Sequence, residues 1–397
     1  MRWPGMTTRS DLPINDMPNP GHDYSTATCD NIAMSTDRLD HTARTAEPPP
    51  GMDMELKQLA AARALVRDLF QPQARLYWGD FLLHAALGWA ALIAIAVLAM
   101  PWWLLLAGWL LAVLALYRAV IFIHELAHLR PGALPGFRLG WNLLCGIPML
   151  APSFTYSGVH NHHHKRDVYG TAGDGEYLAF ARFPHWLLIG HLLLGVLVPA
   201  LVLLRFVLIT PLGWIVPPLR RWSFRSASSL TVDFRYRREA SERDDKHWRW
   251  QEAGAWLWGS GMLALMATGV LPWSLLISWY AVLAGIMITN GVRTLIAHRY
   301  LHDRRSELSL MQQFHDSVDV SGHRYLTSLW APVGLRYHAT HHLFPSMPYH
   351  NLGTAHRRLR AASGISEWYL QAHEPNLRRA WSRLWQARAA LRAANPH

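Results

Sequence analysis

The chain has 397 residues, a formal net charge of +11 and a hydrophobic fraction of 51%. Its apolar residues are gathered into long runs, which is typical of a helical integral membrane protein and excludes a set of ordinary soluble domains. Only two cysteines are present, Cys29 and Cys145, so neither a disulfide framework nor a thiolate metal site can be built. The arginines flank apolar runs, which favours contact with the cytoplasm and anionic headgroups over nucleic-acid binding.

The first part of the chain predicts a leader, a surface helix and a helical hairpin. Residues 1–54 are polar and lack apolar periodicity, so we expect a disordered leader that is not a signal peptide. Residues 55–75 are typical of an amphipathic helix lying near the membrane surface. Residues 81–99 and 102–123 are each long enough to cross a bilayer, and the proline between them predicts a tight turn.

The second helix of this hairpin continues directly into the sequence HELAH. This spacing places His124 and His128 at positions i and i+4, on one helix face at the membrane surface. Residues 141–152 follow, and they are too short and too often interrupted by glycine and proline to cross a membrane. We expect a re-entrant or interfacial segment there, because irregular backbone at membrane depth must be buried in protein.

Two later clusters share the spacing H-x-x-H-H, one in HNHHHK and one at the start of YHATHHLFPSMPYHNL. On a helix this spacing brings three imidazoles to one face. Imidazole is a common ligand of zinc, copper, iron and nickel, so the clusters predict a metal site. Scattered surface histidines would not repeat one spacing beside apolar helices. The members are His160, His163, His164, His338, His341 and His342.

Between these two clusters lie a second predicted hairpin and one ambiguous apolar region. Residues 254–271 and 273–292 predict two crossings with Pro272 at the tip. For all clusters to share one site, residues 185–218 must cross an even number of times. Their several prolines favour a bent, re-entrant or surface-lying element. We therefore expect an all-α integral membrane fold, with four core transmembrane helices in two hairpins and further re-entrant or interfacial segments.

The distribution of charge predicts the orientation. Residues 219–250 are dense in arginine, whereas both hairpin tips are uncharged. By the positive-inside rule, every histidine cluster and both termini are expected in the cytoplasm. The membrane domain is expected to span residues 55–360, capped by a cytoplasmic histidine-rich region, and residues 361–397 to form a basic helical tail.

The number of clustered histidines indicates two metal ions. The three clusters and His298, which follows the second hairpin, supply more imidazoles than one tetrahedral zinc uses, and they suit two ions of about five-fold coordination. Ligand type alone leaves zinc, copper, nickel and iron open. His302 would share a helical face with His298, so either or both could reach the metals, whereas His162 lies off the face of its cluster. Structural or supporting roles are expected for His315, His323, His350 and His356.

Carboxylates are expected beside the ligating imidazoles, because such rings usually donate their other N–H to an acid or a carbonyl. The candidates are Asp167, Asp174, Asp316 and Asp319. An alternative follows from HELAH itself, which matches the zinc-protease pattern H-E-x-x-H with Glu125 as general base. That alternative leaves the two H-x-x-H-H clusters unexplained.

The three clusters, their order and their relation to two hairpins resemble the membrane fatty-acid desaturase family, which are histidine-box non-haem di-iron proteins. The segments GTAGDGEY and RTLIAHRY also resemble that family, and the resemblance covers about residues 75–360. It implies two irons on the cytoplasmic face, O2 as co-substrate, and removal of hydrogen from an unactivated methylene of a lipid acyl chain. The ligands it implies are His124, His128, His160, His163, His164, His298, His338, His341 and His342.

We therefore expect an O2-dependent fatty acyl desaturase. The main alternative is hydroxylation of an acyl, sphingoid or isoprenoid chain by the same site, since the short H-x-x-x-H first box also resembles carotenoid-type hydroxylases. A membrane receptor that binds metal without catalysis is a third possibility. The chain lacks the HPGG motif of a fused cytochrome b5, so no fused haem is expected. A separate ferredoxin-like, rubredoxin-like or cytochrome b5-like donor is expected instead, and the composition resembles that of a bacterial inner-membrane protein.

Overall fold

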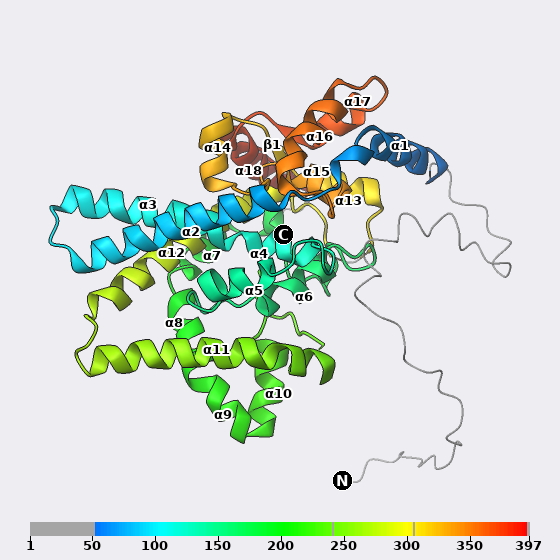
Figure 1. Cartoon of the computed structure of the whole chain (residues 1–397). Helices are drawn as coiled ribbons and strands as arrows, with labels where there is room; N and C mark the ends of the chain where they lie inside the picture. The colour runs from blue at the N-terminus through cyan, green and yellow to red at the C-terminus, as the bar shows by residue number, and fades with distance from the viewer. Residues whose placement is uncertain (1–51, 240–241, 305, 395–397) are drawn as a thin grey trace, which may run out of the picture. The chain divides into compact units, whose positions relative to one another are not determined.

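A computed structural model describes residues 52–239, 242–304 and 306–394 (Figure 1). The described residues are mostly helical, which confirms the all-α expectation. The predicted leader, 1–54, lies outside them except for its last three residues, which begin α1. The elements in chain order are α1 (Met52–Leu65), η1 (Arg67–Leu69), α2 (Ala74–Val97), α3 (Trp102–Val120), α4 (Phe122–His128), α5 (Phe137–Trp141), η2 (Asn142–Gly146), α6 (Phe154–His163), η3 (Phe180–Arg182), α7 (His185–Leu194), α8 (Val198–Leu203), η4 (Leu204–Ile209), α9 (Thr210–Ile215), α10 (Pro217–Ser226), α11 (Glu242–Ala267), α12 (Ser274–Ala297), α13 (Leu310–Asp316), β1 (Asp319–Val320), α14 (Arg324–Trp330), α15 (His338–Leu343), α16 (Tyr349–Ala361), α17 (Ser366–Tyr369), η5 (Leu370–Ala372), β2 (His373–Glu374) and α18 (Leu377–Ala394).

The surface helix predicted over 55–75 is shorter than expected. Helix α1 ends at Leu65, the 3-10 turn η1 follows, and the chain is not helical again until Ala74. Pro72 keeps the residues just before α2 out of a helix, because it has no backbone N–H to donate and disfavours helical geometry in the residue before it.

The first hairpin forms as predicted, and α2 packs closely against α3 (Figure 1). Buried residues recur every three or four positions from Tyr77 to Ala96, so one face of α2 is covered. At Gly88 the helices approach so closely that a Cβ atom would lie 2.9 Å from the backbone nitrogen of Leu116. Small residues permit such contacts between membrane helices.

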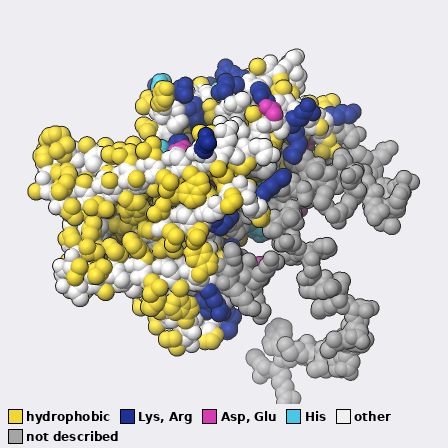
Figure 2. Space-filling model, viewed as in Figure 1, with side chains coloured by type: hydrophobic (Ala, Val, Ile, Leu, Met, Phe, Trp, Pro, Cys, Tyr) yellow, Lys and Arg dark blue, Asp and Glu magenta, His cyan; other side chains and the backbone are white. Residues whose placement is uncertain are grey.

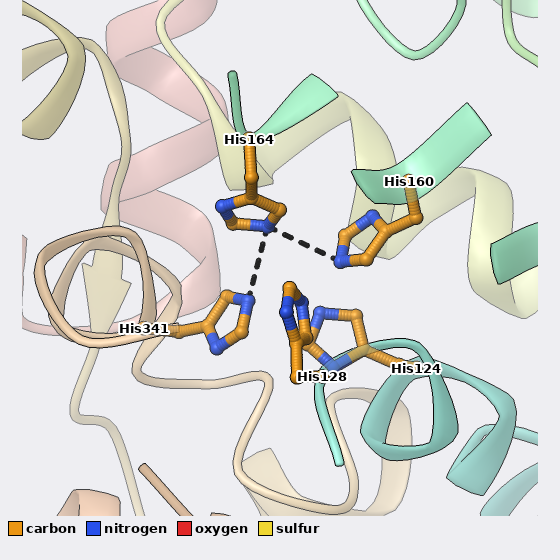
Figure 3. A group of neighbouring side chains, drawn as sticks. All are labelled: His124, His128, His160, His164 and His341. Carbon is orange, nitrogen blue, oxygen red and sulfur yellow. Dashed lines mark hydrogen bonds between the residues drawn. The ribbon is translucent and has the colours of Figure 1, made fainter. Parts of the chain in front are cut away.

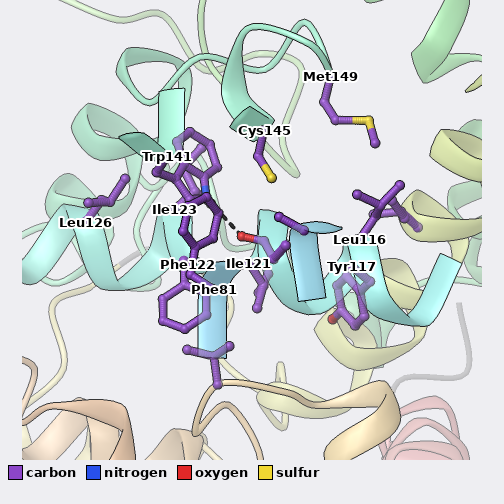
Figure 4. Packing of buried hydrophobic residues seen from close by; sticks show 14 of the residues in the cluster. Phe81, Leu116, Tyr117, Ile121, Phe122, Ile123, Leu126, Trp141, Cys145 and Met149 are labelled. Atoms are coloured by element: carbon purple, nitrogen blue, oxygen red, sulfur yellow. Dashed lines mark hydrogen bonds between the residues drawn. The ribbon is translucent and has the colours of Figure 1, made fainter. Parts of the chain in front are cut away.

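The hairpin continues into the largest hydrophobic core, which also holds the irregular segment after α5 (Figure 4). The indole of Trp141 donates to the carbonyl of Ala119 at 2.9 Å, joining α5 to α3. The π-helical turn η2 and the following turns satisfy their own backbone groups: the amide of Ile147 donates to Asn142 O at 2.7 Å, and the amide of Ala151 donates to Gly146 O at 2.7 Å. This is the buried, non-spanning segment expected for residues 141–152.

The second predicted hairpin is present but open. Its tip lies beside the tip of the first hairpin, where Ser274 Oγ donates to Ala96 O at 2.6 Å. From this tip α11 and α12 diverge (Figure 1), and an apolar cavity of about 660 Å³ lies between α2, α11 and α12. The first part of α11 lies beside α6, where Trp248 stacks on Phe154 at a centroid distance of 5.0 Å.

Among the described residues, four helices are long and apolar enough to cross a membrane, judged by length and composition: Ala74–Val97, Trp102–His128, Val198–Ile215 and Ser274–Ala297. Their number matches the sequence expectation, but one member differs. Helix α11, expected to cross over 254–271, is not among them, because charged and amide residues fill its first half. Val198–Ile215 takes its place.

Val198–Ile215, which comprises α8, η4 and α9, nevertheless lies across the second hairpin (Figure 1). Just before it, Gly195 meets the backbone of Ile288 midway along α12. Farther on, the guanidinium of Arg205 donates to Glu252 at 2.6 Å, near the end of α11 farthest from the tip. The π-helical turn η4 bends it in the middle. This course agrees with a bent element, and the even number of crossings stays a prediction.

The segment after residue 360 packs onto the rest of the unit. Strands β1 and β2 pair in parallel, with Asp319 opposite His373. Trp368 and Tyr369 are buried in the core that also holds α15 and α16, and Leu384 of α18 is buried in another core. The boundary at 360 stays a prediction. Figure 2 shows apolar side chains over the hairpins and Lys and Arg side chains gathered away from the hairpin tips.

Candidate metal centre

Five imidazoles surround one point in Figure 3, and one nitrogen of each lies within 4.8 Å of the others. Helix α4 supplies His124 and His128, one turn apart at the end of the first hairpin. The last turn of α6 supplies His160, the residue directly after that helix is His164, and α15 supplies His341. The Nε2 atom of His164 lies 3.2 Å from Nε2 of both His160 and His341. We call these five residues group 1.

Four further imidazoles form group 2: His163, His298, His338 and His342. The Nε2 atom of His338 lies 3.0 Å from that of His298 and 3.2 Å from that of His342. The two groups are neighbours because adjacent residues of one cluster belong to different groups. In the second cluster, for example, His164 belongs to group 1 and His163 to group 2. All nine histidines singled out from the sequence are thus brought together, and their binding of iron stays a prediction.

The spacing within each group fits one ion. Two nitrogens bound at ~2.1 Å and at right angles about one ion lie ~3.0 Å apart. The Nε2 separations of 3.0–3.2 Å match that value in both groups. Both ring nitrogens of His124 and Nε2 of His128 are buried without a hydrogen-bond partner among the described residues. Buried polar atoms are rarely left unpaired, so the donor set fits a metal ion in each group.

The protonation state of the rings also suits metal binding. Burial lowers the pKa of His160, His164, His341 and His342 well below the ordinary value, so these rings are neutral at physiological pH. Neutral imidazole is the form that binds a metal.

Two carboxylates orient the rings of α6. Asp174 accepts from His163 Nδ1 at 2.8 Å, and Glu176 accepts from His160 Nδ1 at 3.0 Å. Both contacts leave Nε2 facing the group. Burial alone lowers the pKa of His163, but the carboxylate of Asp174 outweighs it and raises that pKa. Burial raises the pKa of Glu176 to about 7.

A tyrosine connects the ring of His298 to an acid. Tyr169 OH lies 2.8 Å from His298 Nδ1 and donates to Asp316 Oδ2 at 2.9 Å. Asp316 itself is 3.9 Å from the ring and also accepts from Tyr177. Burial raises the pKa of Asp316. Asp316 therefore orients the ring of His298 mainly through the hydroxyl of Tyr169.

The other two predicted acids lie elsewhere. Asp319 accepts from the amide of Thr340 at 3.0 Å and from its hydroxyl at 2.5 Å, and Tyr369 and His356 also donate to it. Asp319 therefore fixes the position of α15, the helix that carries the third cluster, and does not orient the ring of a predicted ligand. Asp167 is exposed and forms no hydrogen bond or ion pair within the described part of the chain.

The expectation that His302 shares a face with His298 is wrong, because α12 ends at Ala297 and His298 has an extended backbone. The ring of His302 instead contacts the carbonyl of Ser306 at 2.6 Å. His162 faces Tyr236 at a ring-centroid distance of 6.2 Å. Neither is in a metal group, and the same holds for His315, His323, His350 and His356.

The glutamate of HELAH is not arranged as the base of a protease. Glu125 is buried, accepts from the hydroxyl of Tyr77 and accepts from the amide of Tyr349 at 3.1 Å. It belongs to neither metal group. Its hydrogen bonds join α4 to α2 and to the start of α16, so we assign it a structural role.

Three residues near the site were missed in the sequence. Glu176 lies within the segment GTAGDGEY and Tyr169 directly precedes it, so the resemblance of this segment to the family could have singled them out. Arg293 is a buried cation in an apolar helix, itself a signal of function. Its guanidinium donates to Asn290 Oδ1 at 3.2 Å and to Thr294 Oγ1 at 3.1 Å, and it has no carboxylate partner among the described residues.

Comparisons with known proteins agree with this geometry. The chain is 42% identical over 316 residues to a protein named "Ceramide hydroxylase" from Caulobacter vibrioides (strain NA1000 / CB15N). That match covers 80% of this chain and 90% of the relative. The sequence model of the family described as "Fatty acid desaturase" matches residues 100–373, more than half of the chain. The chain belongs to the fatty acid desaturase family.

Proposed function

We propose that this protein hydroxylates the hydrocarbon chain of a ceramide-like membrane lipid, using O2 and two irons held by the two histidine groups. The observation that carries the proposal is the 42% identity to the ceramide hydroxylase of Caulobacter vibrioides, in a match that covers 90% of that protein. The nine clustered imidazoles, six of them buried, agree with it, because hydroxylation and desaturation use the same kind of site. The sequence alone favoured desaturation over hydroxylation, and the proposal reverses that preference.

In this proposal the residues have distinct tasks. Group 1 and group 2 would each hold one iron. Asp174, Glu176 and Tyr169 would each keep one ligand ring turned toward the iron of its group. Bound iron supplies the oxidising power for activating O2 and breaking an unactivated C–H bond, which no side-chain base can do. The buried setting of the groups excludes water from the reacting carbon.

The balance of the reaction requires an external donor. Inserting one oxygen atom of O2 into a C–H bond gives an alcohol and one water, and consumes two electrons and two protons. We propose that a separate ferredoxin-like, rubredoxin-like or cytochrome b5-like protein supplies the electrons. The net charge of +11 supports an acidic donor, whose approach it would steer.

Desaturation of an acyl chain is the second candidate, and the family match favours it. It consumes the same electrons and protons but removes a second hydrogen and leaves both oxygen atoms as water. A small change in the position of the neighbouring C–H bond decides between the two outcomes.

One experiment separates the two functions. Purified, iron-loaded protein in ceramide-containing vesicles would receive a chemical electron mediator and isotopically labelled O2, and the lipids would be analysed by mass spectrometry. A ceramide that gains one labelled oxygen supports hydroxylation, and one that loses two hydrogens without label supports desaturation. An unchanged lipid contradicts both for this substrate.

A matched pair of variants ties the product to the metal groups. His341→Ala removes a member of group 1 and is expected to abolish the product. His162→Gln alters a histidine of the same chemical type in HNHHHK that lies outside both groups, and is expected to keep it. Equal activity of the two variants would contradict the assignment of the site.

A further inference from the structure

A small cavity connects the surface to group 1. Its volume is about 250 Å³, and Tyr77, Glu125 and His128 line its inner end. Apolar residues, among them Phe70 and Met347, form the walls. Because one small cavity touches both the surface and a member of group 1, a molecule entering it needs to travel only a short way to reach the metal position.

The outer rim of this cavity carries three arginines, Arg63, Arg67 and Arg130, which we call the arginine rim. Arg67 and Arg130 are exposed, and the guanidinium of Arg63 lies 5.3 Å from the ring centroid of Phe70. None of the three forms an ion pair with another described residue. Among the described residues, the rim therefore carries three positive charges that no ion pair offsets.

The nearby acids are engaged elsewhere. Asp68 pairs with Arg358, at 2.5 Å and 2.9 Å. Glu125, at the inner end, accepts hydrogen bonds from Tyr77 and from the amide of Tyr349. Neither carboxylate neutralises the rim, so a ligand that supplies negative charge would be favoured there.

The position of the rim indicates what kind of anion it meets. Arg63 and Arg67 precede the start of α2, and Arg130 follows the end of α4, so all three lie just beyond the same end of the apolar first hairpin. That level corresponds to the headgroups of a bilayer. The recessed shape, with apolar walls behind the charges, suits a lipid with a polar end and a hydrocarbon chain better than the convex surface of a protein.

We propose that the arginine rim binds the phosphate of an anionic lipid substrate, whose chain then passes Phe70 and Met347 toward His128. Arginine matches phosphate geometry with paired hydrogen bonds. The proposal rests on the proposed function and adds to it in two ways. The preferred substrate carries a phosphate on its head, and the reacting carbon lies within a few bonds of that head.

The test compares ceramide with ceramide 1-phosphate of the same chains, presented to iron-loaded protein in phosphate-free dodecyl maltoside micelles with a chemical electron mediator. The wild type is expected to have a KM for the phosphorylated lipid at least about tenfold below that for ceramide. The variant R63Q/R67Q/R130Q is expected to raise that KM by about tenfold, to keep kcat, and to leave the KM for ceramide unchanged.

The control is R360Q/R378Q/R379Q, which removes the same charge from exposed arginines outside the cavity and is expected to leave both KM values unchanged. Native mass spectrometry gives a readout independent of turnover. Ceramide 1-phosphate should bind the wild type and the control, but not the rim variant. Inorganic phosphate alone should not compete at equal concentration, because the rim and the apolar walls act together.

Several outcomes would overturn the proposal. Equal KM values for the two lipids in the wild type would do so, and so would loss of activity on both lipids in the rim variant. A defect seen only when a protein donor replaces the mediator would assign the rim to electron transfer instead. If neither lipid is oxidised but the rim still governs binding in the mass spectrometer, the proposed function fails while the headgroup site stands.

Discussion

A single carboxylate, Asp174, joins several parts of the metal centre. It accepts from the ring of His163 at 2.8 Å, from the amide of Gly170 at 2.8 Å and from the amide of Glu176 at 2.9 Å. It therefore fixes the orientation of a group 2 ring and the course of the loop that brings Glu176 to group 1. Changes at this one residue should be felt in both groups.

The first prediction uses two aspartates of the same segment. Asp174→Asn should lower iron affinity or activity by roughly 10- to 100-fold, because the ring of His163 loses its charged acceptor. Asp167→Asn alters an exposed residue without contacts and should change neither. Iron content by elemental analysis and turnover on the lipid substrate measure the effect. Similar values for the two variants would show that the His163–Asp174 contact is unimportant.

The second prediction concerns the glutamate of HELAH. Glu125→Gln keeps an oxygen that can accept from Tyr77 or from the amide of Tyr349, so iron content should stay near that of the wild type. His128→Ala, one turn away, should lose iron from group 1. A zinc protease would depend on Glu125 above all. Peptide cleavage that disappears in Glu125→Gln would therefore contradict the assignment.

At the scale of single elements, α15 depends on a partner far along the chain. Asp319 accepts from Thr340 in α15 and from Tyr369 in α17, so it joins the third histidine cluster to the C-terminal segment. Burial alone would raise the pKa of Asp319, but the donors around it, led by His356, hold that pKa below its ordinary value. Its contribution to stability is thus complete above pH ~4 and is lost as the pH falls further.

The third prediction follows from this contact. Asp319→Asn should destabilise the protein by about 1–3 kcal/mol and lower its iron content, because α15 loses a charged acceptor at its first turn. Tyr369→Phe removes one donor and should have a smaller effect. Thermal unfolding at neutral pH and well below pH ~4, with iron analysis at neutral pH, measures both variants. An Asp319→Asn variant with wild-type iron content would refute this role.

The fourth prediction concerns the ion pair that joins η4 to α11. Glu252 is fully buried and pairs with Arg205, which is also buried. Glu252→Gln should destabilise the protein by about 3 kcal/mol or more, since it leaves a buried guanidinium without its charge partner. Arg235→Gln breaks an ion pair whose arginine side chain is 77% exposed and should have no measurable effect. Thermal unfolding in detergent distinguishes them.

The elements that the sequence predicts well are those set by local physics. The length of apolar runs is enough to find the first hairpin, and helical spacing is enough to group the clustered histidines. Prediction fails where distant contacts decide. His302 leaves the expected face because the chain turns extended at His298. The second hairpin is present, but the divergence of α11 from α12 beyond its tip does not follow from the length of the apolar runs. Glu176 reaches His160 only through the fold of the loop between them.

At the scale of the whole molecule, the shared site constrains the path of the chain through a membrane. Group 2 contains both His163 and His298, so the chain between them must return to the side from which it started. The second hairpin, α11 and α12, is predicted to make one excursion, although only α12 of the two is among the helices apolar enough to cross by themselves. Val198–Ile215 is apolar enough to be a further crossing, but its position across these helices argues against one.

The fifth prediction tests this path with cysteine labelling in a Cys29→Ser, Cys145→Ser background. Arg182→Cys and Arg221→Cys flank Val198–Ile215 at exposed positions and should react with a membrane-impermeant maleimide from the same side. Gly269→Cys, at the tip of the second hairpin, should react from the opposite side. Labelling of Arg182→Cys and Arg221→Cys from opposite sides would mean that Val198–Ile215 crosses.

The wide spacing of the group 1 histidines along the chain has a consequence for biosynthesis. His124 leaves the ribosome well before His341, yet both belong to the same group. The site therefore cannot close around an ion while the hairpins are being inserted, and a metal added then would meet only partial sets of imidazoles. Closing loops of this length costs little extra entropy once the ends are held by packed helices. The proposed irons would thus be loaded after both segments have been made, which would make iron delivery a late step of maturation.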